Sequence, residues 1–84
     1  LFDEVISIKE LDKENINLIK IKKALFLSNY NKEQEVLEVL NPIINSDSIW
    51  RPNAIDILIG YFLNKGDFLK AEQYKKLLKE SKNN

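Results

Sequence analysis

The chain has 84 residues, 44% of them hydrophobic and 31% charged, which suits one small globular domain rather than a disordered segment. Thirteen basic and thirteen acidic residues cancel to a formal net charge of zero, which argues against a dedicated binder of nucleic acid or of anionic membranes. The sequence contains neither Cys nor His, so the commonest nucleophile, general base and metal ligands are missing. We therefore expect a chain that is not an enzyme, with no catalytic residues, no cofactor and no metal.

The chain begins at Leu1 and contains no Met, so we expect it to be a fragment of a longer protein. Its longest mostly apolar run, residues 55–63, is interrupted by Asp56 and is far shorter than the roughly 20 residues of a membrane span. We expect no direct membrane contact from this fragment. A signal peptide or a membrane anchor preceding Leu1 stays an open alternative.

Apolar residues recur at spacings of three and four, which predicts an all-α fold of about five helices. The first expected helix spans residues 1–13, and a charged stretch from Leu11 to Asn15 separates it from a second helix of about residues 14–28. The apolar residues of the first are Leu1, Phe2, Val5, Ile6 and Ile8, and the main stripe of the second is Leu18, Ile21 and Leu25.

The third expected helix begins at Asn31, a residue type suited to the N-cap, with Gln34 three positions later as in a capping box. Pro42 lacks an N–H group and clashes with the preceding turn, so this helix should kink or end near Asn41. Residues 45–48 read as a loop because they are all Asn, Ser or Asp.

The fourth expected helix, about residues 51–64, carries Pro52 in its first turn, where the missing N–H has little effect. It is apolar nearly all round, which predicts a central element buried on every side. Gly66 should end it in the left-handed conformation, and Asp67 should cap a fifth helix that runs to about Ser81. The predicted core comprises Leu25, Val36, Leu40, Ile55, Leu58, Phe62, Ala71, Tyr74 and Leu78.

The expected helices pair through short turns into units of about 30 to 35 residues, the length of a helix–turn–helix repeat. Leu58 and Phe62 stand four apart on one helix, a Gly-Asp-Phe turn follows at residues 66–68, and Ala71 comes where two helices would touch. This pattern resembles a tetratricopeptide repeat (TPR). The resemblance implies a helical hairpin array in a single domain: residues 1–13 as the trailing helix of an earlier repeat, then hairpins at 14–45 and 50–82.

A narrower resemblance rests on residues 35–44, on Trp50-Arg51-Pro52 and on the Gly66-Asp67-Phe68 turn. Together these segments resemble the bacterial TPR-like family related to the YfgM-type ancillary subunit of the Sec translocon and its α-proteobacterial relatives. The resemblance implies a membrane-anchored protein whose TPR-like domain lies on the periplasmic side of the inner membrane, associated with secretion or chaperone machinery. A cytoplasmic location is the alternative.

Trp50, Arg51 and Tyr61 are the candidate partner-binding residues, because Trp and Arg are favoured anchors at interfaces and Tyr61 could line a groove between helices. The competing interpretation is that Trp50 packs the start of the fourth helix against the third. Lysines near the C-terminus and scattered pairs of acidic residues read as solvated helix surfaces, since no spacing resembles a calcium loop or a phosphate site.

These observations predict a non-catalytic module that binds a protein or peptide partner and no nucleic acid. The alternative is a structural or oligomerisation domain of a cytosolic scaffold protein. Self-association through the first helix is also expected, because its apolar residues outnumber what one neighbouring helix can cover.

Overall fold

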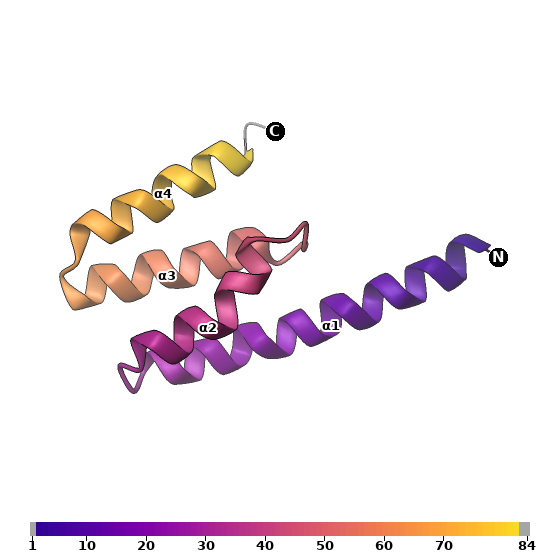
Figure 1. The fold of residues 1–84 in the computed structure, drawn as a ribbon, viewed down its shortest axis with the longest axis horizontal. Helices are drawn as coiled ribbons and strands as arrows, with labels where there is room; N and C mark the ends of the chain where they lie inside the picture. The colour runs from indigo at the N-terminus through magenta and orange to yellow at the C-terminus, as the bar shows by residue number, and fades with distance from the viewer. Residues whose placement is uncertain (1, 83–84) are drawn as a thin grey trace.

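The computed structural model describes the backbone of residues 2–82 and the side chains of residues 11–80. Its regular elements are all α-helices, which confirms the predicted all-α class for the described part of the chain (Figure 1). In chain order they are α1 (Phe2–Ser28), α2 (Glu33–Ile44), α3 (Arg51–Lys65) and α4 (Phe68–Lys82).

Residues 2–82, whose backbone the structure describes, form four helices, so the prediction of five is wrong. The two helices expected at residues 1–13 and 14–28 are the single helix α1. The stretch from Leu11 to Asn15 contains no Gly or Pro, and its charged residues have adequate helix propensity. The charged residues of this stretch therefore leave the helical hydrogen-bond ladder unbroken.

The face that α1 buries also differs from the predicted stripe. From residue 11 onward, where its side chains are described, the buried residues of α1 are Asn17, Ile21 and Ala24, at spacings of four and three. Leu25, predicted for the core, is 49% exposed. Ile21 of the predicted stripe is buried, but α1 carries more apolar residues than one stripe can hold, and periodicity alone placed Leu25 wrongly in the core.

α2 begins at Glu33 rather than at Asn31. Asn31 instead adopts a left-handed backbone with φ of 57° in the turn after α1, a conformation that Asn tolerates better than most residues. Pro42 does not stop the helix, which continues to Ile44. Pro42 lies in the last turn, and Glu38, whose carbonyl would receive the missing bond, is exposed to water.

The second pair of helices follows the predicted boundaries closely. Gly66 ends α3 with φ of 84°, and the N–H of Asp67 donates to the carbonyl of Phe62 at 2.8 Å. Oδ1 of Asp67 accepts a hydrogen bond from the N–H of Lys70 at 3.2 Å, which caps the first turn of α4. This turn fixes α3 and α4 as an antiparallel pair (Figure 1).

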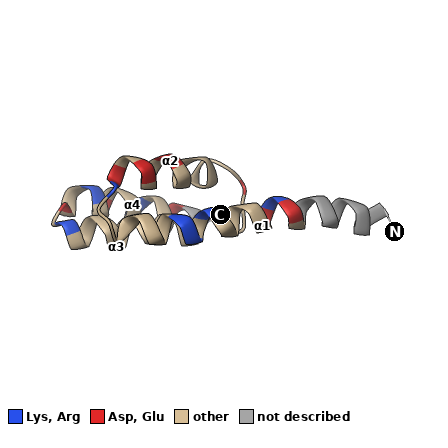
Figure 2. Ribbon diagram, turned by 90° about the horizontal axis from the view of Figure 1, so that it is seen from below, with Lys and Arg blue, Asp and Glu red and all other residues tan. Residues whose placement is uncertain are grey.

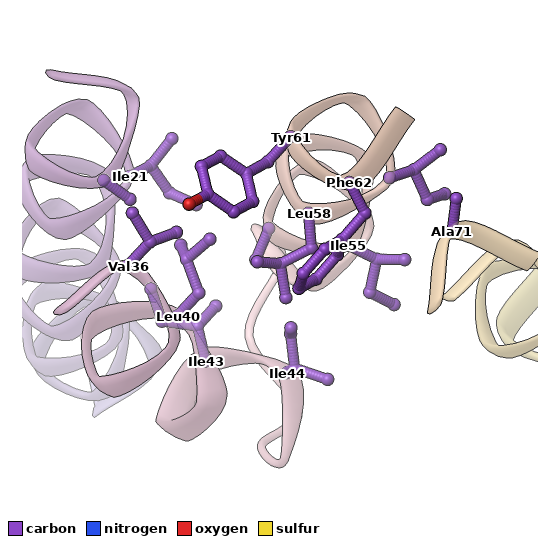
Figure 3. Packing of buried hydrophobic residues seen from close by; sticks show 13 residues of the cluster. Ile21, Val36, Leu40, Ile43, Ile44, Ile55, Leu58, Tyr61, Phe62 and Ala71 are labelled. Carbon is purple, nitrogen blue, oxygen red and sulfur yellow. The ribbon is translucent and has the colours of Figure 1, made fainter. Parts of the chain in front are cut away.

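The core lies where α2 and α3 meet, and Figure 3 shows Leu40 and Ile43 of α2 facing Ile55 and Leu58 of α3. Six of the predicted core residues are buried: Val36, Leu40, Ile55, Leu58, Phe62 and Ala71. Tyr74 and Leu78, which were also predicted for the core, are partly buried against this cluster. The ring of Tyr74 stacks on Phe62 with centroids 5.8 Å apart.

α3 is the central helix, because it packs against each of the other three. α1 pairs with α2, and α4 pairs with α3. α2 lies to one side of α1 and α3 (Figure 2). α1 and α3 therefore also have faces that α2 does not cover, and one of these borders the candidate site.

Candidate protein-binding groove

A shallow hollow of about 380 Å³ lies between the C-terminal end of α1 and the length of α3. The residues that line it are Leu25, Ser28, Asn29, Asp56, Ile57, Gly60, Tyr61 and Asn64. We call this hollow the α1–α3 groove. Its lining mixes apolar surface with amide, hydroxyl and carboxylate groups, a composition that suits a peptide better than a purely apolar ligand.

One face of α3 forms one wall of the groove. Asp56, Ile57, Gly60 and Asn64 recur at spacings of one, three and four residues, which places them on one side of a helix. Asp56 and Asn64 are exposed, and Ile57 is half-buried. The prediction that this helix is buried on every side is therefore wrong along this face.

Gly60 is the most informative residue of the groove. It lies in the interior of α3, where Gly is less favourable than Ala by about 0.5–1 kcal/mol. A Cβ atom built at this position would meet no atom within 4 Å. Helix packing therefore does not require Gly here, and what its missing side chain provides is open space beside Ile57 and Tyr61.

Tyr61, the one sequence-predicted candidate that lines the groove, is only 7% exposed. Its hydroxyl donates a hydrogen bond of 2.9 Å to Oδ1 of Asn31 in the turn between α1 and α2. Its ring packs edge-on against Phe62, with centroids 5.3 Å apart. Tyr61 thus anchors α3 to the first hairpin, and little of its surface is left for a partner.

An ion-pair cluster at the same end of α3 strengthens this junction. Nζ of Lys65 donates to a carboxylate oxygen of Glu33, and Nζ of Lys70 lies 3.6 Å from the other oxygen. The hydrogen bond from Lys65 holds the pKa of Glu33 below its ordinary value. The same bond raises the pKa of Lys65.

Trp50 and Arg51 lie apart from the groove, at the opposite end of α3 from Tyr61, about 15 Å along the helix. Trp50 is half-buried against the core, and its Nε1 is buried without a hydrogen-bond partner among the described residues. Nε of Arg51 donates to the carbonyl of Ile44 at 2.7 Å, which closes the C-terminus of α2. The structure therefore does not bring the three candidates together.

A second polar cluster, which sequence reasoning missed, joins α1 to the loop between α2 and α3. The hydroxyl of Ser48 donates to Oε1 of Glu14 at 2.5 Å, and the N–H of Ile49 donates to Oε2 at 2.9 Å. Asn17 donates to Glu14 at 3.0 Å and to Ser48 at 3.1 Å. These bonds, led by that of Ser48, lower the pKa of Glu14.

The signal for this cluster was present in the sequence as a polar residue on a buried stripe. Asn17 stands four residues before Ile21 and seven before Ala24, and it is only 8% exposed. A buried amide requires hydrogen-bond partners. One partner, Glu14, is three residues away, but the other, Ser48, is 31 residues away, so periodicity indicates the need for such a partner without identifying it.

Among the described residues, no group of three or more acidic side chains is placed to hold a metal ion. Over the same part of the chain, none of the helices combines the length and the apolar character needed to cross a bilayer. The chain matches no family model, no curated protein and no solved structure. The function proposed below therefore rests on the geometry of the groove and on the residue patterns of the sequence.

Proposed function

We propose that this chain is a non-catalytic protein-interaction module that binds a short peptide segment of a partner protein in the α1–α3 groove. The observation that carries the proposal is Gly60, a helix-interior glycine that packing does not require and that opens space in the wall of the groove. A glycine that weakens its own helix and is not required for core packing suggests that binding of a partner requires it.

The mixed lining supports a peptide as the ligand. Leu25 and Ile57 offer apolar surface for a side chain of the partner. Asn29, Asp56 and Asn64 are exposed donors and acceptors that suit the N–H and C=O groups of a peptide backbone.

We further propose that the two helix pairs are TPR-like hairpins. The features that support this are the turn at Gly66 and Asp67, the complete burial of Leu58 and Ala71, and the near-complete burial of Phe62. Ala71 has no exposed surface and lies where α4 packs on α3, as a small residue at a close helix contact should. In TPR-like arrays the first helices of successive pairs line the binding surface, the role proposed here for α1 and α3.

The resemblance to the YfgM-type family supports a finer proposal, a periplasmic module of a membrane-anchored protein beside secretion or chaperone machinery. The cytosolic scaffold is the alternative. Fusion of alkaline phosphatase, which is active only outside the cytoplasm, to the C-terminus of the full-length protein separates the two. An inactive but stable fusion would contradict the periplasmic proposal.

The groove is tested by selecting peptides from a phage-displayed random library on the wild-type chain and measuring their affinity for two variants. Gly60→Trp fills the groove from a site where an added Cβ atom meets no atom within 4 Å. Gln73→Trp, on an exposed face of α4, adds the same side chain outside it. We expect Gly60→Trp to weaken peptide binding at least tenfold and Gln73→Trp to leave it unchanged. If no selected peptide distinguishes the two variants, the groove is not the binding site.

A further inference from the structure

α1 carries a second apolar face that no other described helix covers. Ile16, Ile19, Phe26 and Tyr30 are 54%, 64%, 59% and 61% exposed. At 100° per residue Ile16, Ile19 and Phe26 cluster on the side of α1 opposite Ile21, which faces the core, and Tyr30 follows in the turn after α1. The rings of Phe26 and Tyr30 contact each other, with centroids 5.0 Å apart. We call these four residues, together with Asp12 and Lys23, the outer stripe.

The outer stripe follows the spacing of a coiled-coil seam. Its positions 12, 16, 19, 23, 26 and 30 are separated alternately by four and three residues. Four of the six positions are apolar, and the other two hold Asp12 and Lys23, both exposed. Neither of these charged groups makes an ion pair with another described residue.

The first four positions of the outer stripe, residues 12, 16, 19 and 23, are complementary to themselves when their order is reversed. Ile16 and Ile19 stand at the centre, Asp12 lies four residues before Ile16, and Lys23 lies four residues after Ile19. Two such helices placed antiparallel, with a two-fold axis between residues 17 and 18, bring Ile16 against Ile19 of the second copy. The same register brings Asp12 against Lys23 of the second copy on both sides of the axis.

We propose that the outer stripe binds a second copy of this chain as an antiparallel helix pair in this register. The charges select the orientation, because a parallel, in-register pair would place Asp12 against Asp12 and Lys23 against Lys23. A symmetric dimer is also the commonest closed assembly of identical chains. This inference goes beyond the peptide-binding role and uses a different face of α1 from the groove, so either can fail without the other.

The charge pattern allows a matched test by sedimentation equilibrium of the 84-residue chain at about 10 to 200 µM. We expect a monomer–dimer equilibrium for the wild type. Asp12→Lys and Lys23→Asp each replace two attractive contacts by two repulsive ones, and each should weaken the dimer about tenfold or more. An equimolar mixture of the two variants should dimerise again, because each heterodimer restores opposite charges at both contacts.

Helical content and melting temperature of both variants serve as folding controls, since positions 12 and 23 are exposed. A wild-type chain that stays monomeric at 200 µM would overturn the proposal and leave the outer stripe to another occupant. Dimerisation that the single variants do not weaken, or that mixing does not restore, would overturn the register.

Cysteine cross-linking tests the orientation, because the chain has no other Cys. Oxidation of an equimolar mixture of Asp12→Cys and Lys23→Cys chains should give a covalent dimer that joins the two variants. Each variant alone should not cross-link, because its two Cys residues would lie about 16 Å apart in the antiparallel pair. A covalent dimer formed readily by either variant alone would show a parallel pair instead.

Discussion

The hydroxyl of Tyr61 on α3 donates a hydrogen bond of 2.9 Å to Oδ1 of Asn31, the one non-glycine residue with a positive φ among those described. The bond spans 30 residues of sequence. It holds the turn between α1 and α2 against the end of the groove. The position of one groove wall relative to the other therefore depends on this contact.

We expect Tyr61→Phe and Asn31→Gly each to lower the free energy of unfolding by about 0.5–1.5 kcal/mol, the usual contribution of one hydrogen bond. Glycine keeps the left-handed backbone at position 31 without strain, so Asn31→Gly removes only the acceptor. Urea titrations of both single variants and the double variant measure the coupling. Effects that add fully in the double variant would mean that the bond does not stabilise the fold.

The two leucines Leu58 and Leu25 provide a matched test of the burial pattern. Leu58 has no exposed surface, whereas Leu25 is 49% exposed on the groove. Leu58→Ala should lower the free energy of unfolding by about 2–5 kcal/mol, and Leu25→Ala should lower it by less than about 1 kcal/mol. Equal losses in a denaturant titration would place Leu25 in the core, as periodicity predicts.

Gly60 should be replaceable by Ala with a gain in stability. Gly60→Ala reduces the freedom of the unfolded chain and fits a helical position with open space, so it should add about 0.5–1 kcal/mol. Gly66→Ala is the control: a Cβ there also meets no atom within 4 Å, but φ is 84°. It should cost about 1–2 kcal/mol. Destabilisation by Gly60→Ala, measured by thermal melting, would mean that packing requires this glycine.

Acid should weaken the fold partly through Glu14 and Glu33. Both carboxyl groups have a pKa lowered in the folded chain, so their stabilising contribution is present above the unfolded pKa. It is lost as the pH falls through the folded pKa, so the melting-temperature difference between wild type and Glu14→Gln or Glu33→Gln should shrink from about pH 6 to pH 3.

High salt should distinguish the contribution of Glu33 to stability from that of Glu14. The partner that affects Glu33 most is the charged Lys65, whereas Glu14 is held chiefly by the neutral Ser48 and Ile49. The contribution of Glu33 should therefore fall in about 1 M NaCl while that of Glu14 persists. A difference between wild type and Glu14→Gln that does not change with pH would show that Glu14 is not bound as a carboxylate.

The sequence was sufficient to predict the elements whose signals are local. Both ends of α3 and the start of α4 follow from Pro52, Gly66 and Asp67, each of which has a conformational requirement of its own. The buried residues of α2 follow from a single clear stripe, as at Val36 and Leu40. These features depend on the chain only within a few residues.

Other features could not be predicted because they depend on distant partners. α1 has apolar residues on two faces, and only the position of α2 decides that Ile21 is buried and Leu25 is not. The same holds for Asn31, whose side chain meets Tyr61 from another helix. Gly60 was visible in the sequence, but its open surroundings appear only once α1 lies beside α3.

The most direct test of the peptide-binding role is to map where a selected peptide binds, by titrating it into ¹⁵N-labelled chain and following the amide resonances. We expect shifts that concentrate at residues 25–29 and 56–64, together with peptide contacts to the side chains of Leu25 and Ile57. Shifts that concentrate instead around Trp50 and Arg51, or along the outer stripe at Ile16 and Ile19, would contradict it.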